Sequence, residues 1–207
     1  MKCFLLLVVV VVAAACGGKV PQTRYYQLAA PTTAARGDGA VIVLEQLATD
    51  AGYDDERIVY RTTPYRMDYY DYHRWSASPG VVVGNYLEQA LERSGRFRAV
   101  IREVSDQAAI VLGGRVVALE EIDRSKARWV GRIVIELTAA DPRTNEILWT
   151  EQFEEIEPLA VQSPEGLAQA ITKAMSRIVA KAAPQIADHA DRQAALHAAE
   201  PAMARGK

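Results

Sequence analysis

"AAIVLGGRVVALEEIDRSKARWVGRIVIELTAAD" (residues 108–141) holds two long runs of alternating side chains on either side of a charged segment, DRSK. Apolar residues at every second position have the period of a β-strand with one buried face. In the second run one face carries Trp129, Ile133, Ile135 and Leu137, and the other carries Arg128, Arg132, Glu136 and Thr138. The stretch therefore predicts a long β-hairpin with one face open to water.

A third strand follows on the C-terminal side of this hairpin. The segment "DPRTNE" (residues 141–146) has the composition of a turn. After it, "ILWTEQFEEI" (residues 147–156) places Ile147, Trp149 and Phe153 on one face. Three consecutive strands joined by short turns predict an antiparallel meander.

Two helices begin in the same way, with a serine followed by a proline, at Ser78 and at Ser163. A serine hydroxyl can cap the first turn, and proline at the next position has no N–H to leave unpaired. Gly95 stands where the first helix should end, because glycine suits the left-handed residue after a helix. Apolar residues recur at helical spacing in both segments: Val83, Tyr86, Leu87, Ala90 and Leu91 in the first, and Leu167, Ala170, Ile171, Ala174, Met175 and Ile178 in the second.

The N-terminal half supplies further extended segments. We expect a short first strand at residues 24–28, a buried strand at residues 40–48, where β-branched residues follow one another, and another at residues 57–63 that Pro64 ends. The aromatic segment at residues 65–75 and the run at residues 97–104 are also expected to be extended.

These elements predict an α+β fold, in which an antiparallel β-sheet has two main α-helices packed on one face. The domain should span residues 40–184. The remaining segment, residues 185–207, is rich in alanine and poor in large apolar residues, which predicts a flexible C-terminal tail, either a frayed helical extension or disordered.

The N-terminus has the layout of a bacterial export signal: Lys2, then an apolar run, then Ala13 to Ala15 before Cys16. The apolar run is shorter than the roughly 20 residues that a membrane-spanning helix needs. The three alanines before Cys16 resemble a lipobox, which implies a lipoprotein signal peptide at residues 1–15 and lipidation of Cys16. Residues 16–39 would then tether the domain to the membrane. An ordinary export signal with an incidental cysteine is the alternative.

Composition excludes several classes of protein. The 207 residues include 24 Lys and Arg and 26 Asp and Glu, a net charge of -2, and the two signs are interspersed without the basic stripe of a nucleic-acid-binding protein. The only cysteines are Cys3 and Cys16. Once the signal is removed and Cys16 is acylated, no thiol remains for a disulfide, a zinc site or a nucleophile.

The whole pattern resembles the ABC-type transport auxiliary lipoprotein family, the PqiC-like lipoproteins. The resemblance rests on the lipobox, "YYQL" (residues 25–28), "IVYR" (residues 58–61), Arg74-Trp75, and the helix "VVVGNYLEQALERSGRF" (residues 81–97). It covers about residues 25–182. These motifs are weakly specific alone, and their order and spacing carry the resemblance.

The resemblance implies a fold like that of the N-terminal domain of TolB and a subunit without catalytic residues or a cofactor. It also implies an MCE-domain protein and a membrane permease as partners, in a system that moves lipids between two membranes. The residue after Cys16 is Gly17 rather than the aspartate that retains lipoproteins in the inner membrane of enteric bacteria. The expected location is therefore the outer membrane, facing the periplasm, and the chain can form a homo-oligomer.

The segment "YRMDYYDYHRW" (residues 65–75) is the candidate interface. Strand alternation would place Tyr70 and Tyr72 on one face and Tyr69, Asp71, His73 and Trp75 on the other. Tyrosine, tryptophan and arginine are enriched at protein interfaces, because they bury large areas and keep a polar group. The candidate residues are Tyr69, Tyr70, Tyr72, Arg74 and Trp75, although aromatic side chains that fill the core explain the segment equally well.

Sequence signals for chemistry are weak. Asp71 and His73 are two possible metal ligands, which do not make a site, and the other histidines fall in the expected tail. The acidic runs "EEID" (residues 120–123) and "EQFEEIE" (residues 151–157) are interpreted as solvated strand positions. We therefore expect no metal, no cofactor and no catalytic residue.

Four functions remain open at this point. The favoured one is a docking or adaptor subunit of an inter-membrane lipid transporter, anchored to the outer membrane. The others are a periplasmic lipid carrier, an anchored hydrolase, and an assembly factor of another envelope machine. The clean alternation of the meander strands favours the adaptor over the carrier, because it leaves the second face of the sheet polar.

Overall fold

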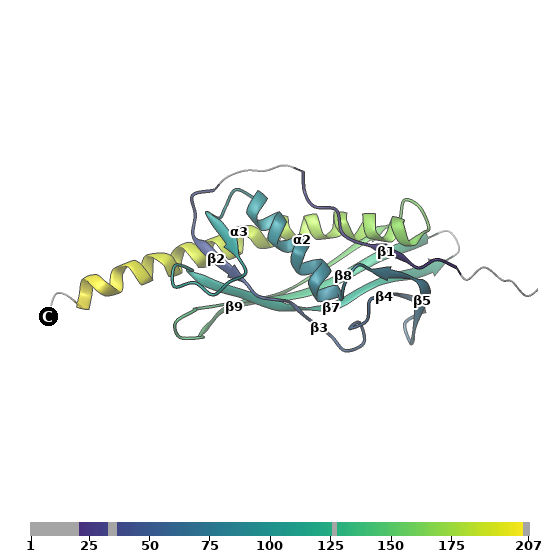
Figure 1. Ribbon diagram of the computed structural model, residues 1–207, viewed down its shortest axis with the longest axis horizontal. Helices are drawn as coiled ribbons and strands as arrows, with labels where there is room; N and C mark the ends of the chain where they lie inside the picture. Colours follow the sequence, from purple (N-terminus) through teal and green to yellow (C-terminus); the bar gives the residue numbers. More distant parts are fainter. Residues whose placement is uncertain (1–20, 33–36, 126–127, 205–207) are drawn as a thin grey trace, which may run out of the picture.

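The computed structural model describes residues 21–32, 37–125 and 128–204, which contain nine strands and two helices (Figure 1). The strands are β1 (Arg24–Tyr26), β2 (Val41–Leu44), β3 (Ala48–Thr49), β4 (Arg57–Thr63), β5 (Arg66–Trp75), β6 (Ala99–Ile101), β7 (Ile110–Ser125), β8 (Arg128–Ala140) and β9 (Ile147–Pro158). The helices are α2 (Pro79–Arg93) and α3 (Pro164–Ala204). The segments expected to be extended at residues 24–28 and 97–104 form strands of three residues each.

Strand β7 organises the sheet, because it pairs along both edges. One edge pairs antiparallel with β8, which in turn pairs antiparallel with β9, as the predicted meander requires. The other edge pairs in succession with β2, β3 and β4, all parallel to β7. On the far side of β4, β5 pairs antiparallel with β4, and β1 pairs parallel with β5. On the far side of β2, β6 pairs parallel with β2.

The α+β class with two helices on one face is confirmed. The sheet is mixed rather than wholly antiparallel, and this is the difference from the expected sheet. Parallel neighbours need long crossover connections. Helix α2 lies in such a connection, between β5 and β6, and so allows β6 to align parallel to β2.

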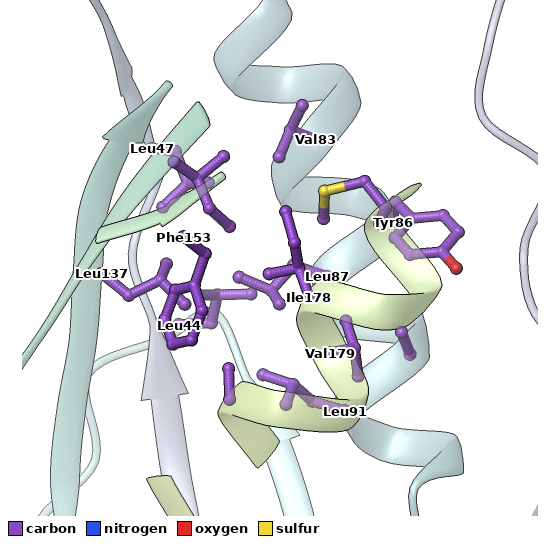
Figure 2. Close-up of a cluster of buried hydrophobic side chains, with 14 of the residues drawn as sticks. Leu44, Leu47, Val83, Tyr86, Leu87, Leu91, Leu137, Phe153, Ile178 and Val179 are labelled. Carbon is purple, nitrogen blue, oxygen red and sulfur yellow. The ribbon is translucent and has the colours of Figure 1, made fainter. Parts of the chain in front are cut away.

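Both helices cover the same face of the sheet (Figure 1). Figure 2 shows the core between them, where Leu44, Leu137 and Phe153 of the strands face Leu87 and Ile178 of the helices. Four of these side chains are fully buried, and Phe153 is 5% exposed. Each such side chain contributes about 1.5–3 kcal/mol by leaving water, so this layer holds the helices to the sheet.

The helix ends follow the sequence in most respects. Gly95, with a φ of 71°, takes the left-handed conformation after α2. The Ser163 hydroxyl accepts a hydrogen bond from the backbone N–H of Gly166 at 3.0 Å. Ser78 occupies the N-cap of α2, but its hydroxyl makes no capping hydrogen bond. The proline after each serine marks both helix starts.

The C-terminal segment differs from the flexible tail expected at residues 185–207. Helix α3 continues to Ala204, with Ile186 and Ala190 fully buried. Gln193 Nε2 donates to Asp141 Oδ2 at 2.7 Å and ties the helix to the turn between β8 and β9. Alanine is a strong helix former, and its small side chain permits close packing, so a segment with few large apolar residues can still be ordered.

In the described ranges, no helix combines the length and the apolar character that crossing a membrane requires.

Candidate functional site

The face of the sheet that points away from the helices carries ion pairs that connect neighbouring strands. Arg115 of β7 contacts Asp50 at 2.6 Å and Glu136 of β8 at 3.0 Å. Further along β8, the hydroxyls of Thr138 and Thr150 lie 3.1 Å apart. We call this surface of β7, β8 and β9 the open face. Its strands are paired over most of their length, so it is a rigid surface, polar except for a small buried apolar cluster around Val134.

A buried carboxylate lies on the open face, toward the end where β7 finishes and β8 begins. Glu120 is only 2% exposed and accepts hydrogen bonds from Tyr53 Oη at 2.6 Å, Arg61 Nε at 2.6 Å and Arg132 Nη1 at 2.9 Å. Arg132 also donates through Nε to Glu154 at 2.7 Å. These contacts join the loop before β4 to β4, β7, β8 and β9.

Burial and the neighbouring Glu120 raise the pKa of Tyr53 to about 12, so Tyr53 keeps its proton and acts as a donor. The two arginines balance the charge of Glu120, which burial alone would make unfavourable. The cluster is therefore a structural support for the open face.

A second acidic pair lies on the helix side of β7. Glu121 is fully buried and accepts a hydrogen bond from Tyr70 at 2.7 Å. Glu121 Oε2 and Asp123 Oδ1 are buried and find no hydrogen-bond partner among the described residues. Burial, and then the neighbouring Asp123, raise the pKa of Glu121 to about 7, and burial also raises the pKa of Asp123. When Glu121 is protonated, its carboxyl O–H can donate a hydrogen bond to Asp123, which gives Glu121 Oε2 and Asp123 Oδ1 a partner.

This pair predicts a pH-dependent contribution to stability. Folding raises the pKa of Glu121 from 4.5 to about 7, so the folded chain binds more protons than the unfolded chain between these values. The contribution is therefore fully present below the unfolded pKa and is lost as pH rises through the folded pKa. The Glu121→Gln variant stays neutral at every pH. We expect its free energy of unfolding to exceed that of the wild type by about 1–3 kcal/mol at about pH 8 and to equal it near the unfolded pKa of Glu121.

Urea unfolding of both chains at the two pH values tests this expectation. Glu146→Gln, at an exposed position of the turn before β9, is the control and should change stability little at either pH. An advantage of Glu121→Gln that is the same at both pH values would contradict a titrating Glu121.

The five candidate interface residues do not form one surface. Trp75 is 1% exposed and belongs to the core, so it leaves the candidate interface. Tyr70 is half-buried against Glu121, and Tyr69 donates to the carbonyl of Gly52 at 3.2 Å. Tyr72 is 39% exposed and Arg74 is partly exposed. Tyr72 is thus the most accessible of the five candidates, and Tyr69, Tyr70 and Arg74 are partly accessible.

An irregularity in β5 explains why its side chains do not lie on the faces that strict alternation predicts. Arg57 pairs with Arg74, but Val59 pairs with Tyr69, so β5 has extra residues between these pairs. Such a bulge breaks strict alternation. As a result Tyr70 contacts His73 edge-to-face at 5.6 Å between ring centres, although alternation had placed them on opposite faces.

The histidines serve structural contacts. Burial lowers the pKa of His73, and its Nδ1 shares a hydrogen bond with Tyr26 Oη at 2.8 Å. His189 lies beside Trp149, with 6.1 Å between ring centres, and His197 contacts Asp141 at 3.3 Å. Within the described part of the chain, no three His, Cys, Asp or Glu side chains are grouped to hold a metal ion.

The Glu120 cluster was missed by the sequence analysis, which interpreted "EEID" as solvated. Glu120 and Glu121 are buried because β7 is paired on both edges at this point, with β4 and with β8. Their place within a long strand was the available signal. Arg61 lies on β4 and Arg132 on β8. The residues of these strands alone do not predict that both side chains would meet Glu120 of β7.

Cys16, the expected lipidation site, lies outside the described residues. Strand β1, which was predicted within the tether at residues 16–39, is part of the sheet and shows from which end the preceding chain would approach. Strand β1 runs parallel to β5, and β5 runs opposite to β4, which is parallel to β7. The start of β1 therefore points to the end of the sheet where β4 and β7 finish, near Pro64 and Ser125 (Figure 1). We call this end the tether end.

Comparison with known proteins agrees with this architecture. The sequence model of the ABC-type transport auxiliary lipoprotein component family matches residues 26–187. A protein from Xanthomonas campestris has a TM-score of 0.66 at 16% identity, over 76% of this chain and 91% of its own. An uncharacterized protein has a TM-score of 0.65 at 15% identity, over 80% and 99%. At these identities the two structures share the fold. We found no match among curated proteins.

Proposed function

Because this chain belongs to the ABC-type transport auxiliary lipoprotein component family, we propose that it is a docking subunit of an inter-membrane lipid transporter. In this role it performs no catalysis. It is anchored to the outer membrane through Cys16, faces the periplasm, and binds an MCE-domain protein and a permease of the same system. The family assignment supports a lipoprotein that accompanies an ABC transporter, and the finer role is our proposal.

The observation that carries the docking role is the open face. It is broad because β7, β8 and β9 have 16, 13 and 12 residues. Its side chains are held in place by ion pairs between strands, such as Arg115 with Asp50 and Glu136. A preorganised polar surface loses little side-chain freedom on binding, which favours recognition of a protein partner.

The first test is affinity capture of the full-length chain, tagged at its C-terminus and extracted from membranes in mild detergent. We expect an MCE-domain protein and a permease at a defined ratio, identified by mass spectrometry. The mass of the captured complex also reports whether the subunit is a homo-oligomer. Stoichiometric phospholipid without these proteins would instead indicate a carrier, and recovery of neither would contradict the transport role.

Charge reversal on the open face should separate docking from folding. Arg115 is 43% exposed as a side chain, so Arg115→Glu should leave the fold intact while opposing a partner that complements the surface. We expect partner recovery to fall by at least about tenfold, as for an arginine at the centre of an interface. Quantitative mass spectrometry of the captured complex measures this.

Arg192→Glu is the matched control, because Arg192 is exposed on α3, in the helix layer. Its partner recovery should equal that of the wild type. Equal recovery with Arg115→Glu would exclude this part of the open face as the docking surface.

A further inference from the structure

A cavity of about 580 Å³ opens beside the Glu120 cluster. Three arginines, Arg61, Arg124 and Arg132, contribute to its wall, together with Thr62 and Thr63. The end of β4, the end of β7 and the first part of β8 provide these residues, so the cavity lies at the tether end. Pro64 and Ile122 add an apolar part to its lining.

The side chains that line the cavity carry more positive than negative charge. The carboxylate of Glu120 is shared by Arg61 and Arg132, and Arg132 also contacts Glu154. Arg124 is exposed and forms no ion pair with any residue that the structure describes. Asp123, the other acidic residue of the lining, has one carboxylate oxygen buried on the helix side of β7 beside Glu121. Arg124 is thus an uncompensated cation at this cavity.

The cavity also lies at the end of the sheet toward which the chain leads back from β1. Cys16 precedes Arg24, the first residue of β1, by eight positions, so a fully extended tether spans about 28 Å. Both Tyr65, 96% exposed in the loop between β4 and β5, and Tyr25, 62% exposed in β1, are on this part of the molecule. Exposed tyrosines suit the boundary between lipid headgroups and water.

From this geometry we propose that the cavity binds the phosphate of an anionic phospholipid of the membrane that holds the anchor. The inference rests on the proposed function, because it needs an acylated Cys16. Arginine is suited to phosphate through charge-assisted, bidentate hydrogen bonds. The hydroxyls of Thr62 and Thr63 add donors, and Pro64 and Ile122 can contact the glycerol and the first methylenes. The contact orients the tether end, and so the open face, relative to the membrane.

Native mass spectrometry of the full-length protein in a neutral detergent tests the proposal. The ligands are dioleoyl-phosphatidylglycerol, dioleoyl-phosphatidylcholine and inorganic phosphate, titrated separately. We expect a Kd for phosphatidylglycerol about tenfold below that for phosphatidylcholine. Arg124→Glu should raise the Kd for phosphatidylglycerol about tenfold, whereas Arg124→Lys, which keeps the charge but not the bidentate geometry, should raise it by less. Arg192→Glu, an exposed charge reversal on α3, should have no effect.

Equal binding of the two lipids, or unchanged binding in Arg124→Glu, would overturn the proposal. Inorganic phosphate that binds as tightly as phosphatidylglycerol would overturn the assignment to a lipid and leave a site for free anions. The same spectra report the mass of the acyl chains. An unacylated chain would contradict the proposed anchoring and this inference together, whereas an acylated chain without lipid preference contradicts this inference alone.

Discussion

Replacing Glu120 with alanine is expected to destabilise the fold by about 3–5 kcal/mol, the usual cost of breaking a buried ion pair. Glu120 is 2% exposed and is the shared acceptor of Tyr53, Arg61 and Arg132. Without it, the partly buried guanidinium groups of Arg61 and Arg132 and the hydroxyl of Tyr53 lose their shared acceptor. Urea unfolding followed by circular dichroism measures the loss.

Glu154→Ala is the matched control, since Glu154 also pairs with Arg132 but its side chain is 47% exposed. An exposed pair contributes little, so this variant should cost less than about 1 kcal/mol. If both variants cost the same, Glu120 does not hold the open face together. A Glu120→Ala chain that folds normally yet loses its protein partner would instead place Glu120 in the docking surface itself.

The long hairpin and the two helices could be predicted because each has a repeating pattern of side chains within its own segment. The β7–β8 hairpin was visible because both arms alternate over more than ten residues around a charged turn. The helices were visible because a Ser-Pro start and an apolar stripe coincide in each. The parallel order of β2, β3 and β4 along β7 was not visible, because strands of two to seven residues do not encode their neighbours.

The candidate site was predicted less well, for a related reason. Whether an acidic residue in a strand is solvated depends on what pairs with that strand and what crosses its face. For Glu120 the answer comes from Arg61, which is 59 positions away, and from Tyr53, which is 67 positions away. The bulge in β5 likewise depends on its pairing with β4, and it moved the tyrosines of the candidate interface away from their expected faces.

The C-terminal segment gives the sharpest contrast between composition and packing. Its low content of large apolar residues predicted a flexible tail, yet Ile186 is fully buried in the main core cluster. We therefore expect Ile186→Ala to destabilise the whole domain by about 2–5 kcal/mol, the range for truncating a buried isoleucine. A residue in a flexible tail would contribute almost nothing, so this substitution distinguishes the two descriptions.

Leu196→Ala provides the control within the same helix, because Leu196 is 60% exposed. It should change stability by less than about 0.5 kcal/mol, as surface substitutions usually do. Urea unfolding of the full-length chain with each substitution measures both values. Equal, small effects would show that the end of α3 folds independently of the sheet, and the contact of Gln193 with Asp141 would then be dispensable. A large effect at Ile186 alone would make the middle of α3, beyond Pro184, part of the domain that holds the open face.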